Sequence, residues 1–296
     1  MLTRILTAAV ALAILIPVMI FGGVWGVCAI FAVISAFSIY EMLECCGLRR
    51  HYSLSVPMIA IALLIPLFKG LSLFAKNKTL ESADIFAYKA LLSVGSVAVT
   101  VLFAIAVIWV IFVATLKYNK IDAEKLFMFF GLFVYIQFGF LSLVSLGSAV
   151  EPGVFSIKVL AFVLIMAWAT DTFAYFTGMA FGKKKLCPDI SPKKTVAGAI
   201  GGTLLGSAAG AVYILLILDF SALSIVLAAC APVFSVISQF GDLGASVIKR
   251  KFGVKDYGKL FPGHGGVLDR FDSVIPVSIA VYAVCLIADA VKNIAG

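Results

Sequence analysis

Long apolar stretches separated by short polar segments run along almost the whole chain. About nine of them are long enough to cross a membrane as an α-helix, which needs roughly 20 mostly apolar residues. Their approximate cores are Ile5–Phe21, Val24–Tyr40, Leu54–Phe74, Ala90–Leu116, Leu126–Leu146, Val159–Gly178, Val196–Leu218, Ser221–Gly241 and Ser273–Val291. No segment alternates apolar and polar residues as a membrane β-barrel does. The pattern predicts an all-α fold: a polytopic integral membrane helical bundle with about nine transmembrane helices.

Two of these stretches need a closer reading. Ile5–Phe21 resembles a secretory signal, but a second apolar stretch follows almost at once, so we predict a first membrane span and not a cleaved peptide. Leu54–Phe74 is interrupted by Pro57, Pro66 and Lys69, which predicts a span that is kinked or partly re-entrant.

Composition supports the membrane assignment. Hydrophobic residues make up 63% of the chain, and only 13% of residues are charged, about half the usual share in soluble domains. The net charge of +8 suits either cytoplasmic loops that face anionic lipid or a site for anionic substrates. The six cysteines form no CxxC pair and read as apolar filler, and two histidines are too few for a histidine-rich metal centre.

The basic residues predict an orientation in the membrane. With the N-terminus inside, most of the 23 Lys and Arg residues face the cytoplasm, and nine spans place the C-terminus outside. The exceptions are Lys69, Lys76, Lys78, Lys89, Lys158 and Lys292.

The two halves of the chain differ in chemistry. Spans in residues 1–150 carry almost no ionisable groups and read as a scaffold, whereas residues 151–296 contain the polar motifs and read as the catalytic region. In the second half, Gly198–Ala211 has small residues at four-residue spacing, which predicts close helix–helix packing.

Four polar patches of the second half reach the same predicted membrane face: Asp171, Ser191–Thr195, Gly241–Arg250 and Gly263–Asp272. Asp171 lies inside an apolar span, where an unpaired carboxylate costs about 2.5–3.5 kcal/mol, so we expect either a functional role or a Lys or Arg partner. Because four segments converge, we predict a polar site at this face.

Each patch has a chemical interpretation and a structural alternative. Ser191–Thr195 has the form of a helix start with two lysines, which favours anions, although Lys193 and Lys194 also fit as topology charges. If the helix that contains Asp242 continues, Ser246, Lys249 and Arg250 follow on the same side.

The patch before the last span combines acids and glycines. Asp269 and Asp272 are three residues apart, so on a helix they share a face and suit Mg²⁺ together with substrate phosphates; a helix start paired with Arg270 is the alternative. The glycines of Gly263–Gly266 allow backbone amides to approach an anion, and His264 either touches a phosphate or is structural.

Together these groups suit phosphate chemistry. The sequence suggests no Ser-His-Asp set. A phosphate monoester is largely dianionic at neutral pH, because its second pKa is about 6, and it needs no strong base to act as a nucleophile. The main barrier is repulsion between polyanions, which metal ions and basic side chains lower.

These residues carry a resemblance to a known family. Ser246–Asp272 reads "SVIKRKFGVKDYGKLFPGHGGVLDRFD" and resembles the motif of the phosphatidate cytidylyltransferases, also called CDP-diacylglycerol synthases. The fixed positions of that motif are Ser246, Lys249, Arg250, Lys255, Asp256, His264, Gly265, Gly266, Asp269, Arg270 and Asp272. Upstream, "DTFAYFTG" and "ISPKKT" are also similar to the family, so the resemblance covers roughly the C-terminal half.

The resemblance implies an integral membrane enzyme that converts CTP and phosphatidic acid into CDP-diacylglycerol and pyrophosphate, with Mg²⁺ as cofactor. We expect Asp242 and Asp269, with Asp272, to hold the metal. The other catalytic candidates are Lys249, Arg250, His264 and Arg270. The substrate-binding candidates are Asp171, Ser191, Lys193, Lys194, Thr195, Ser246, Lys255, Asp256, Gly263, Gly265 and Gly266. We expect a multi-pass protein of the inner (plasma) membrane with its site facing the cytoplasm, membrane lipid around it, a homodimer as a possible assembly and no nucleic-acid partner.

The chain departs from the family pattern at a few positions. Ala245 and Ala197 stand where many relatives carry glutamate, and Val196 and Phe173 also differ, which indicates a subfamily or a shifted lipid or nucleotide preference. Two other functions remain open: another CTP-using lipid enzyme of the polyprenol or phytol kinase type, and a transporter with Asp171 in its path.

Overall fold

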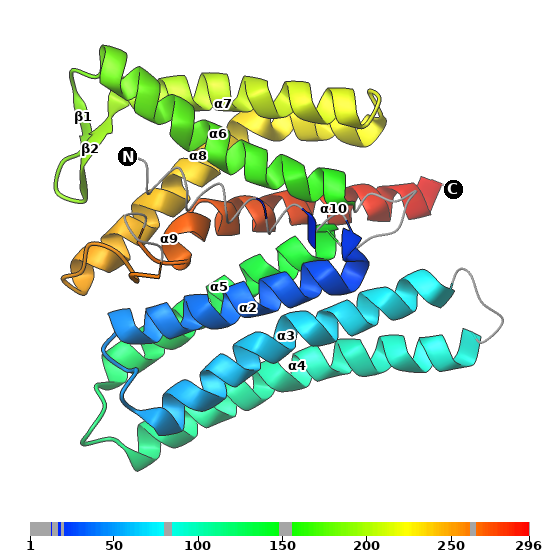
Figure 1. The fold of residues 1–296 in the computed structure, drawn as a ribbon, viewed down its shortest axis with the longest axis vertical. Helices are drawn as coiled ribbons and strands as arrows, with labels where there is room; N and C mark the ends of the chain where they lie inside the picture. Colours follow the sequence, from blue (N-terminus) through cyan, green and yellow to red (C-terminus); the bar gives the residue numbers. More distant parts are fainter. Residues whose placement is uncertain are drawn as a thin grey trace. The chain divides into compact units, whose positions relative to one another are not determined.

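The computed structural model describes residues 13, 17–18, 21–79, 85–147, 156–260 and 265–295. These residues are almost entirely helical, and eight of their helices are long and apolar enough to cross a membrane (Figure 1). The predicted all-α membrane bundle is therefore confirmed. The predicted first span, Ile5–Phe21, lies mostly outside the described residues.

The eight long helices follow the predicted spans closely. They are α2 (Gly23–Cys45), α3 (Tyr52–Thr79), α4 (Ile85–Leu116), α5 (Ala123–Gly147), α6 (Ile157–Phe181), α7 (Val196–Ile217), α8 (Ala222–Lys251) and α10 (Val274–Ala295). The remaining described elements are the short helix α9 (Leu268–Phe271) and the strands β1 (Lys185–Cys187) and β2 (Ser191–Thr195).

Helix α3 corrects one prediction. It runs without interruption through Pro57 and Pro66, so the re-entrant alternative is wrong. Proline removes one backbone donor, but a helix in a membrane can keep its course where neighbouring helices cover the freed carbonyl. Helix α3 has such neighbours, because it packs against α2, α4 and α5.

The chain forms two compact units. The first unit is Met1–Val150 with Asp256–Asp269, and the second is Glu151–Lys255 with Arg270–Gly296. The boundary between the units therefore falls inside α9. The segment Asp256–Asp269, which belongs to the predicted catalytic motif, packs with the helices of the first half of the chain.

The first unit is built around α2, α3 and α5, with α4 packed on α3. Its core is rich in phenylalanine: the rings of Phe31 on α2 and Phe140 on α5 lie 6.3 Å apart, and both side chains are fully buried. One buried polar contact joins the same two helices, because Gln137 Nε2 donates to Ser35 Oγ at 2.9 Å. Such contacts satisfy polar groups that lipid cannot.

The second unit is held together by the close approach of α6 and α7. Gly202, Gly206 and Gly210 of α7 face α6, where added Cβ atoms would meet Ala174, Thr170 and Met166, respectively. The prediction that Gly198–Ala211 serves helix packing is confirmed. Helix α8 completes the unit with α10, and Thr170 of α6 shares a 2.8 Å hydrogen bond with Ser235 of α8.

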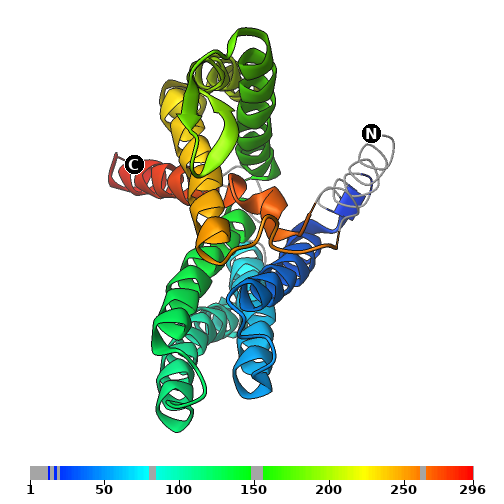
Figure 2. The same ribbon diagram turned by 90° about the vertical axis from the view of Figure 1, so that its left-hand side faces the viewer.

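Strands β1 and β2 form an antiparallel hairpin that pairs Lys185 with Thr195 and Cys187 with Ser191. Figure 2 shows this hairpin beside the start of α7. Thr195 caps α7, because its Oγ1 accepts a hydrogen bond from Gly198 N at 3.1 Å. The prediction that Ser191–Thr195 is a helix start is right for Thr195 and wrong for Lys193 and Lys194, because pairing with β1 holds these lysines in a strand.

Candidate active site

Polar side chains of the second unit gather around Asp171 of α6. The carboxylate of Asp171 accepts a hydrogen bond from Ser273 Oγ at 3.0 Å. It also interacts electrostatically with Asp242 of α8, Lys194 of β2 and Arg270 of α9. The expected convergence is therefore confirmed for these patches of the second unit.

Two ion pairs run through this cluster. Lys194 Nζ lies 2.6 Å from Asp242 Oδ2, and both side chains are about one quarter exposed. Lys249 Nζ lies 3.7 Å from Asp272 Oδ2, and both of these side chains are 11% exposed. The cluster therefore places acidic groups, which can bind cations, beside basic groups, which can bind phosphates.

Helix α8 positions several of these groups because it extends ten residues past the predicted end of its apolar core, to Lys251. Asp242, Ser246 and Lys249 follow one another at helical spacing, as predicted for a continuing helix. Arg250 points elsewhere: its Nε donates to Ile190 O and its Nη1 to Val254 O, each at 3.3 Å. Arg250 thus ties the end of α8 to the turn of the hairpin.

The acids before α10 do not share one helix. Asp269 lies in α9, which ends at Phe271, and Asp272 lies in the turn that follows. Asp272 Oδ1 accepts a hydrogen bond from Ser273 N at 2.9 Å, and its Oδ2 faces Lys249. The expectation of one helical face for Asp269 and Asp272 is wrong, because α9 is only one turn long.

Asp269 organises the motif segment inside the first unit. Its Oδ2 accepts hydrogen bonds from Tyr257 N at 2.8 Å and from Gly266 N at 3.0 Å. Gly265 has φ +83°, a conformation that favours glycine, and an added Cβ there would lie 2.9 Å from Asp269 Oδ2. The glycines of this motif therefore allow the backbone to close around the carboxylate. Gly263 and His264 lie outside the described residues.

Several predicted binding residues lie at the surface of their unit. Lys193 and Lys255 are exposed in the second unit, and Asp256 is exposed in the first. Ser191 and Ser246 are half-buried. These side chains are available to a ligand, whereas Thr195 is buried and serves as a cap.

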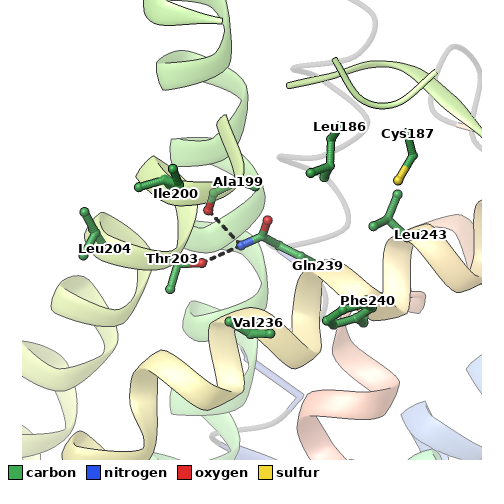
Figure 3. A pocket seen from close by; sticks show the side chains of 10 residues that line it. All are labelled: Leu186, Cys187, Ala199, Ile200, Thr203, Leu204, Val236, Gln239, Phe240 and Leu243. Carbon is green, nitrogen blue, oxygen red and sulfur yellow. Dashed lines mark hydrogen bonds between the residues drawn. The ribbon is translucent and has the colours of Figure 1, made fainter. Parts of the chain in front are cut away.

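An apolar groove lies in the second unit, between the hairpin and helices α7 and α8 (Figure 3). It encloses about 540 Å³. The residues that line it are Leu186, Cys187, Ala199, Ile200, Thr203, Leu204, Val236, Gln239, Phe240 and Leu243. The Gln239 amide turns its nitrogen to α7, where it donates to Ala199 O at 3.1 Å and Thr203 Oγ1 at 2.8 Å. The lining of the groove suits a hydrocarbon chain.

Comparison with known proteins adds the family. The model of the cytidylyltransferase family matches residues 2–288 of this chain. The chain belongs to the cytidylyltransferase family. A phosphatidate cytidylyltransferase of Staphylococcus saprophyticus is 32% identical over 276 residues, which cover 92% of this chain and 94% of the relative.

Two other relatives of the same name match more strongly over shorter stretches. The Brucella abortus biovar 1 (strain 9-941) protein is 43% identical over 152 residues, and the Bacillus subtilis (strain 168) protein is 42% identical over 118 residues. These matches cover 51% and 40% of this chain, and 54% and 44% of the relatives. The chain thus spans about half the length of these two relatives in the matched region.

The donor chemistry of this cytidylyltransferase-family chain fits a magnesium ion. Mg²⁺ is commonly bound through one or two carboxylates, with substrate phosphates and waters completing the octahedron. Asp171 and Asp242 supply two interacting carboxylates in the second unit. Within the described ranges, no group of three or more His, Cys, Asp or Glu side chains lies together as a complete site, so this pair would rely on substrate oxygens.

One buried acid of the family member escaped the sequence analysis. Glu41 of α2 is 3% exposed, and its two carboxylate oxygens accept hydrogen bonds from Val267 N and Leu268 N at 2.9 and 2.8 Å. The predicted span Val24–Tyr40 stops one residue before Glu41, which hid it. The sequence does contain an indication of its role. The helix dipole disfavours an acid near the C-terminal end of an apolar helix, so such an acid is expected to have a hydrogen-bonding or ionic partner.

Proposed function

We propose that this chain transfers CMP from CTP to phosphatidic acid and releases pyrophosphate, and so makes CDP-diacylglycerol. The observation that carries the proposal is the family match over residues 2–288, together with a phosphatidate cytidylyltransferase that aligns over 92% of the chain. The basic and acidic side chains of the second unit support it, because both substrates carry phosphates.

In the proposed reaction, an oxygen of the phosphatidic acid phosphate attacks the α-phosphorus of CTP. A new phosphorus–oxygen bond forms, the bond from the α-phosphorus to the bridging oxygen breaks, and pyrophosphate leaves with that electron pair. The attacking phosphate is largely dianionic at neutral pH, so no base is required. The protein has to bring two polyanions together in line and offset the charge on the leaving group.

Lys194 and Asp242 suit this task as a pair. They are close partners, and about one quarter of each side chain remains exposed. A phosphate group would take the ammonium of Lys194 as its partner, while the carboxylate of Asp242 becomes available to the cation that accompanies CTP. Lys249 and Arg270 add positive charge to the same cluster.

Magnesium is the proposed cofactor. The second unit offers Asp171 and Asp242 to it, and Asp269 and Asp272, which the sequence predicts as ligands with Asp242, stay a prediction. When bound, Mg²⁺ would neutralise phosphate charge and orient the polyphosphate. Asp242 offers a carboxylate that is ion-paired with the side chain of Lys194. Asp269 contributes a carboxylate whose Oδ2 already accepts two backbone amides, which fixes its orientation.

The groove supports a lipid acceptor. We propose that it holds an acyl chain of phosphatidic acid, because its volume is within the range of about 300–1,000 Å³ seen for ligand sites and its lining is nearly all apolar. Its lining includes Leu243 and Leu186, whose chain neighbours are the Asp242 of the ion pair and Lys185. Charge complementarity at that end would hold the headgroup phosphate while the groove takes the hydrocarbon.

The eight apolar helices among the described residues make the chain a multi-pass membrane protein. We propose that it lies in an inner (plasma) membrane with the cluster facing the cytoplasm, where CTP is found. The basic last turn of α8, Lys249, Arg250 and Lys251, agrees with a cytoplasmic helix end. A homodimer remains a prediction.

The test is an assay of purified protein with phosphatidic acid, CTP and MgCl₂. We expect CDP-diacylglycerol and pyrophosphate in equal amounts, no product in excess EDTA, and recovery when Mg²⁺ is restored. Asp242→Asn should lose nearly all turnover while the protein remains in the membrane fraction. CDP in place of pyrophosphate, with a lipid alcohol as acceptor, would show a kinase and overturn the proposal, as would full activity in EDTA.

A further inference from the structure

Glu41 links the first half of the chain to the motif segment. Its carboxylate accepts the amides of two consecutive residues, Val267 and Leu268, with one oxygen each. Those amides stand at the start of α9, where backbone N–H groups have no partner within the helix. All of these groups belong to the first unit.

Two glycines of the segment lie close against the same carboxylate. A Cβ added at Gly258 or at Gly266 would overlap Glu41, and for both glycines the three nearest atoms belong to the Glu41 side chain. Neither residue has a positive φ, so conformation alone does not require glycine there. The approach of Glu41 accounts for both.

The segment also closes on Asp269. Asp269 Oδ2 accepts hydrogen bonds from the amides of Tyr257 and Gly266. Gly266 thus lies between two carboxylates, because its amide bonds to Asp269 and a Cβ added to it would overlap Glu41. Tyr257, Val267 and Leu268 are all buried. A shift of Glu41 would therefore move the backbone that orients Asp269.

We propose that Glu41 is a positioning residue that fixes Asp269 for the reaction through the amides of Val267 and Leu268. The inference rests on the proposed function, in which Asp269 acts at the metal. It assigns to the first half of the chain a direct part in orienting Asp269 of the motif segment, beyond serving as membrane scaffold.

The test compares Glu41→Gln with Glu44→Gln. Glu44 lies one turn further on α2, is half exposed and pairs with Arg49 at 3.0 Å, which makes it a matched control on the same helix. Glutamine keeps the size of Glu41 but turns an NH₂ group toward one of the two backbone amides. We expect Glu41→Gln to lower kcat by about 10- to 100-fold, as for groups that orient metal ligands, with KM for CTP little changed.

Hydrogen exchange gives a second readout that does not depend on catalysis. In substrate-free protein, Glu41→Gln should speed exchange in the peptide that contains Gly265–Asp269, and Glu44→Gln should leave it as in wild type. If wild type makes no CDP-lipid but exchange responds as expected, the proposed function fails and the contact stands. Wild-type kcat in Glu41→Gln, with or without faster exchange, overturns the positioning role.

A double-mutant cycle guards against simple misfolding. Gly258→Ala should lower kcat while Glu41 is present, because the added methyl displaces its carboxylate. In a Glu41→Ala background the same change should add little, since the methyl then has space. Additive losses would overturn the inference. If every Glu41 variant fails to fold, Gly258→Ala alone decides: a wild-type kcat and exchange pattern would rule the role out.

Discussion

Lys194 is both ion-paired and partly exposed. It pairs with Asp242 at 2.6 Å, yet about one quarter of its side chain remains exposed, in contrast to the more buried pair of Lys249 and Asp272. A partly exposed pair contributes little to stability, so the proposed role of Lys194 in phosphate binding predicts a larger effect on catalysis than on stability.

We expect Lys194→Gln to lower kcat/KM for CTP by about 10- to 100-fold, because a hydrogen bond to a charged phosphate is lost. The thermal midpoint should change little. Lys184→Gln is the control, since Lys184 is exposed on the loop that leads into the same hairpin. Equal losses in both variants would point to general surface charge and contradict a specific role for Lys194.

The residues of the site differ in how far the sequence could predict them. Asp171 and Asp242 could be found because an acid in or at the end of an apolar span is locally unusual. Glu41 could not be assigned a partner, because the amide of Val267 lies 226 residues further along the chain. The double use of Asp269 as an acceptor for Tyr257 and Gly266 is equally a property of the folded backbone.

At the scale of elements, the long helices were predictable, because the apolar length needed to cross a membrane is a local property of the sequence. The hairpin was not, because a strand depends on its partner: Ser191–Thr195 reads as a helix start until Lys185–Cys187 pairs with it. The four-residue glycine spacing on α7 correctly predicted that another helix packs closely against it. That helix is α6.

The contact between α6 and α7 predicts a stability effect. In Gly206→Val, the new side chain meets Thr170, whose Oγ1 and Cα lie 2.6 and 2.8 Å from an ideal Cβ. We expect a loss of about 1–3 kcal/mol, as for other overpacked interfaces, read as a lower thermal midpoint in detergent. Gly131→Ala on α5 is the control, because nothing lies within 4 Å of its Cβ and the midpoint should hold or rise.

The groove between α7, α8 and the hairpin predicts a dependence on acyl-chain length. In Val236→Trp, the indole fills space that we assign to hydrocarbon, so a long acyl chain loses packing contacts in the groove. KM for dioleoyl phosphatidic acid should rise several-fold, while KM for the dihexanoyl form stays near wild type.

Val226→Trp provides the matched control for the groove. Val226 is 45% exposed on the same helix and does not line the groove, so its replacement should affect neither lipid. If Val236→Trp changes both KM values equally, the groove does not hold the acyl chain.

At the scale of the whole molecule, the polar chemistry belongs to both units. The second unit contains Asp171, Asp242 and their lysines, whereas the motif segment Asp256–Asp269 packs with α2 and its neighbours in the first. From the sequence alone, that segment is assigned to the second half of the chain. Nothing within it indicates that the amides of Val267 and Leu268 donate to Glu41 on α2.

The orientation of the chain in the membrane can be tested on one helix. Helix α8 runs from Ala222 to Lys251, with a polar turn at Asp219 before it and three basic residues at its end. Because it is long and apolar enough to span, its two ends should lie on opposite faces, and the basic end should be cytoplasmic. A cysteine at Lys251 should react with an impermeant maleimide in inverted vesicles only, and one at Asp219 in right-side-out vesicles only.

After two replacements, the native cysteines should give no background in this labelling experiment. Cys28, Cys45, Cys46 and Cys285 are buried, and burial raises the pKa of the Cys46 thiol to about 12, so it holds almost no reactive thiolate at neutral pH. Cys187 and Cys230 are half-buried and should be changed to serine first. If Lys251→Cys reacts from the outer face, the basic end of α8 and its ion-paired cluster cannot meet cytosolic CTP, and the proposed reaction loses its substrate.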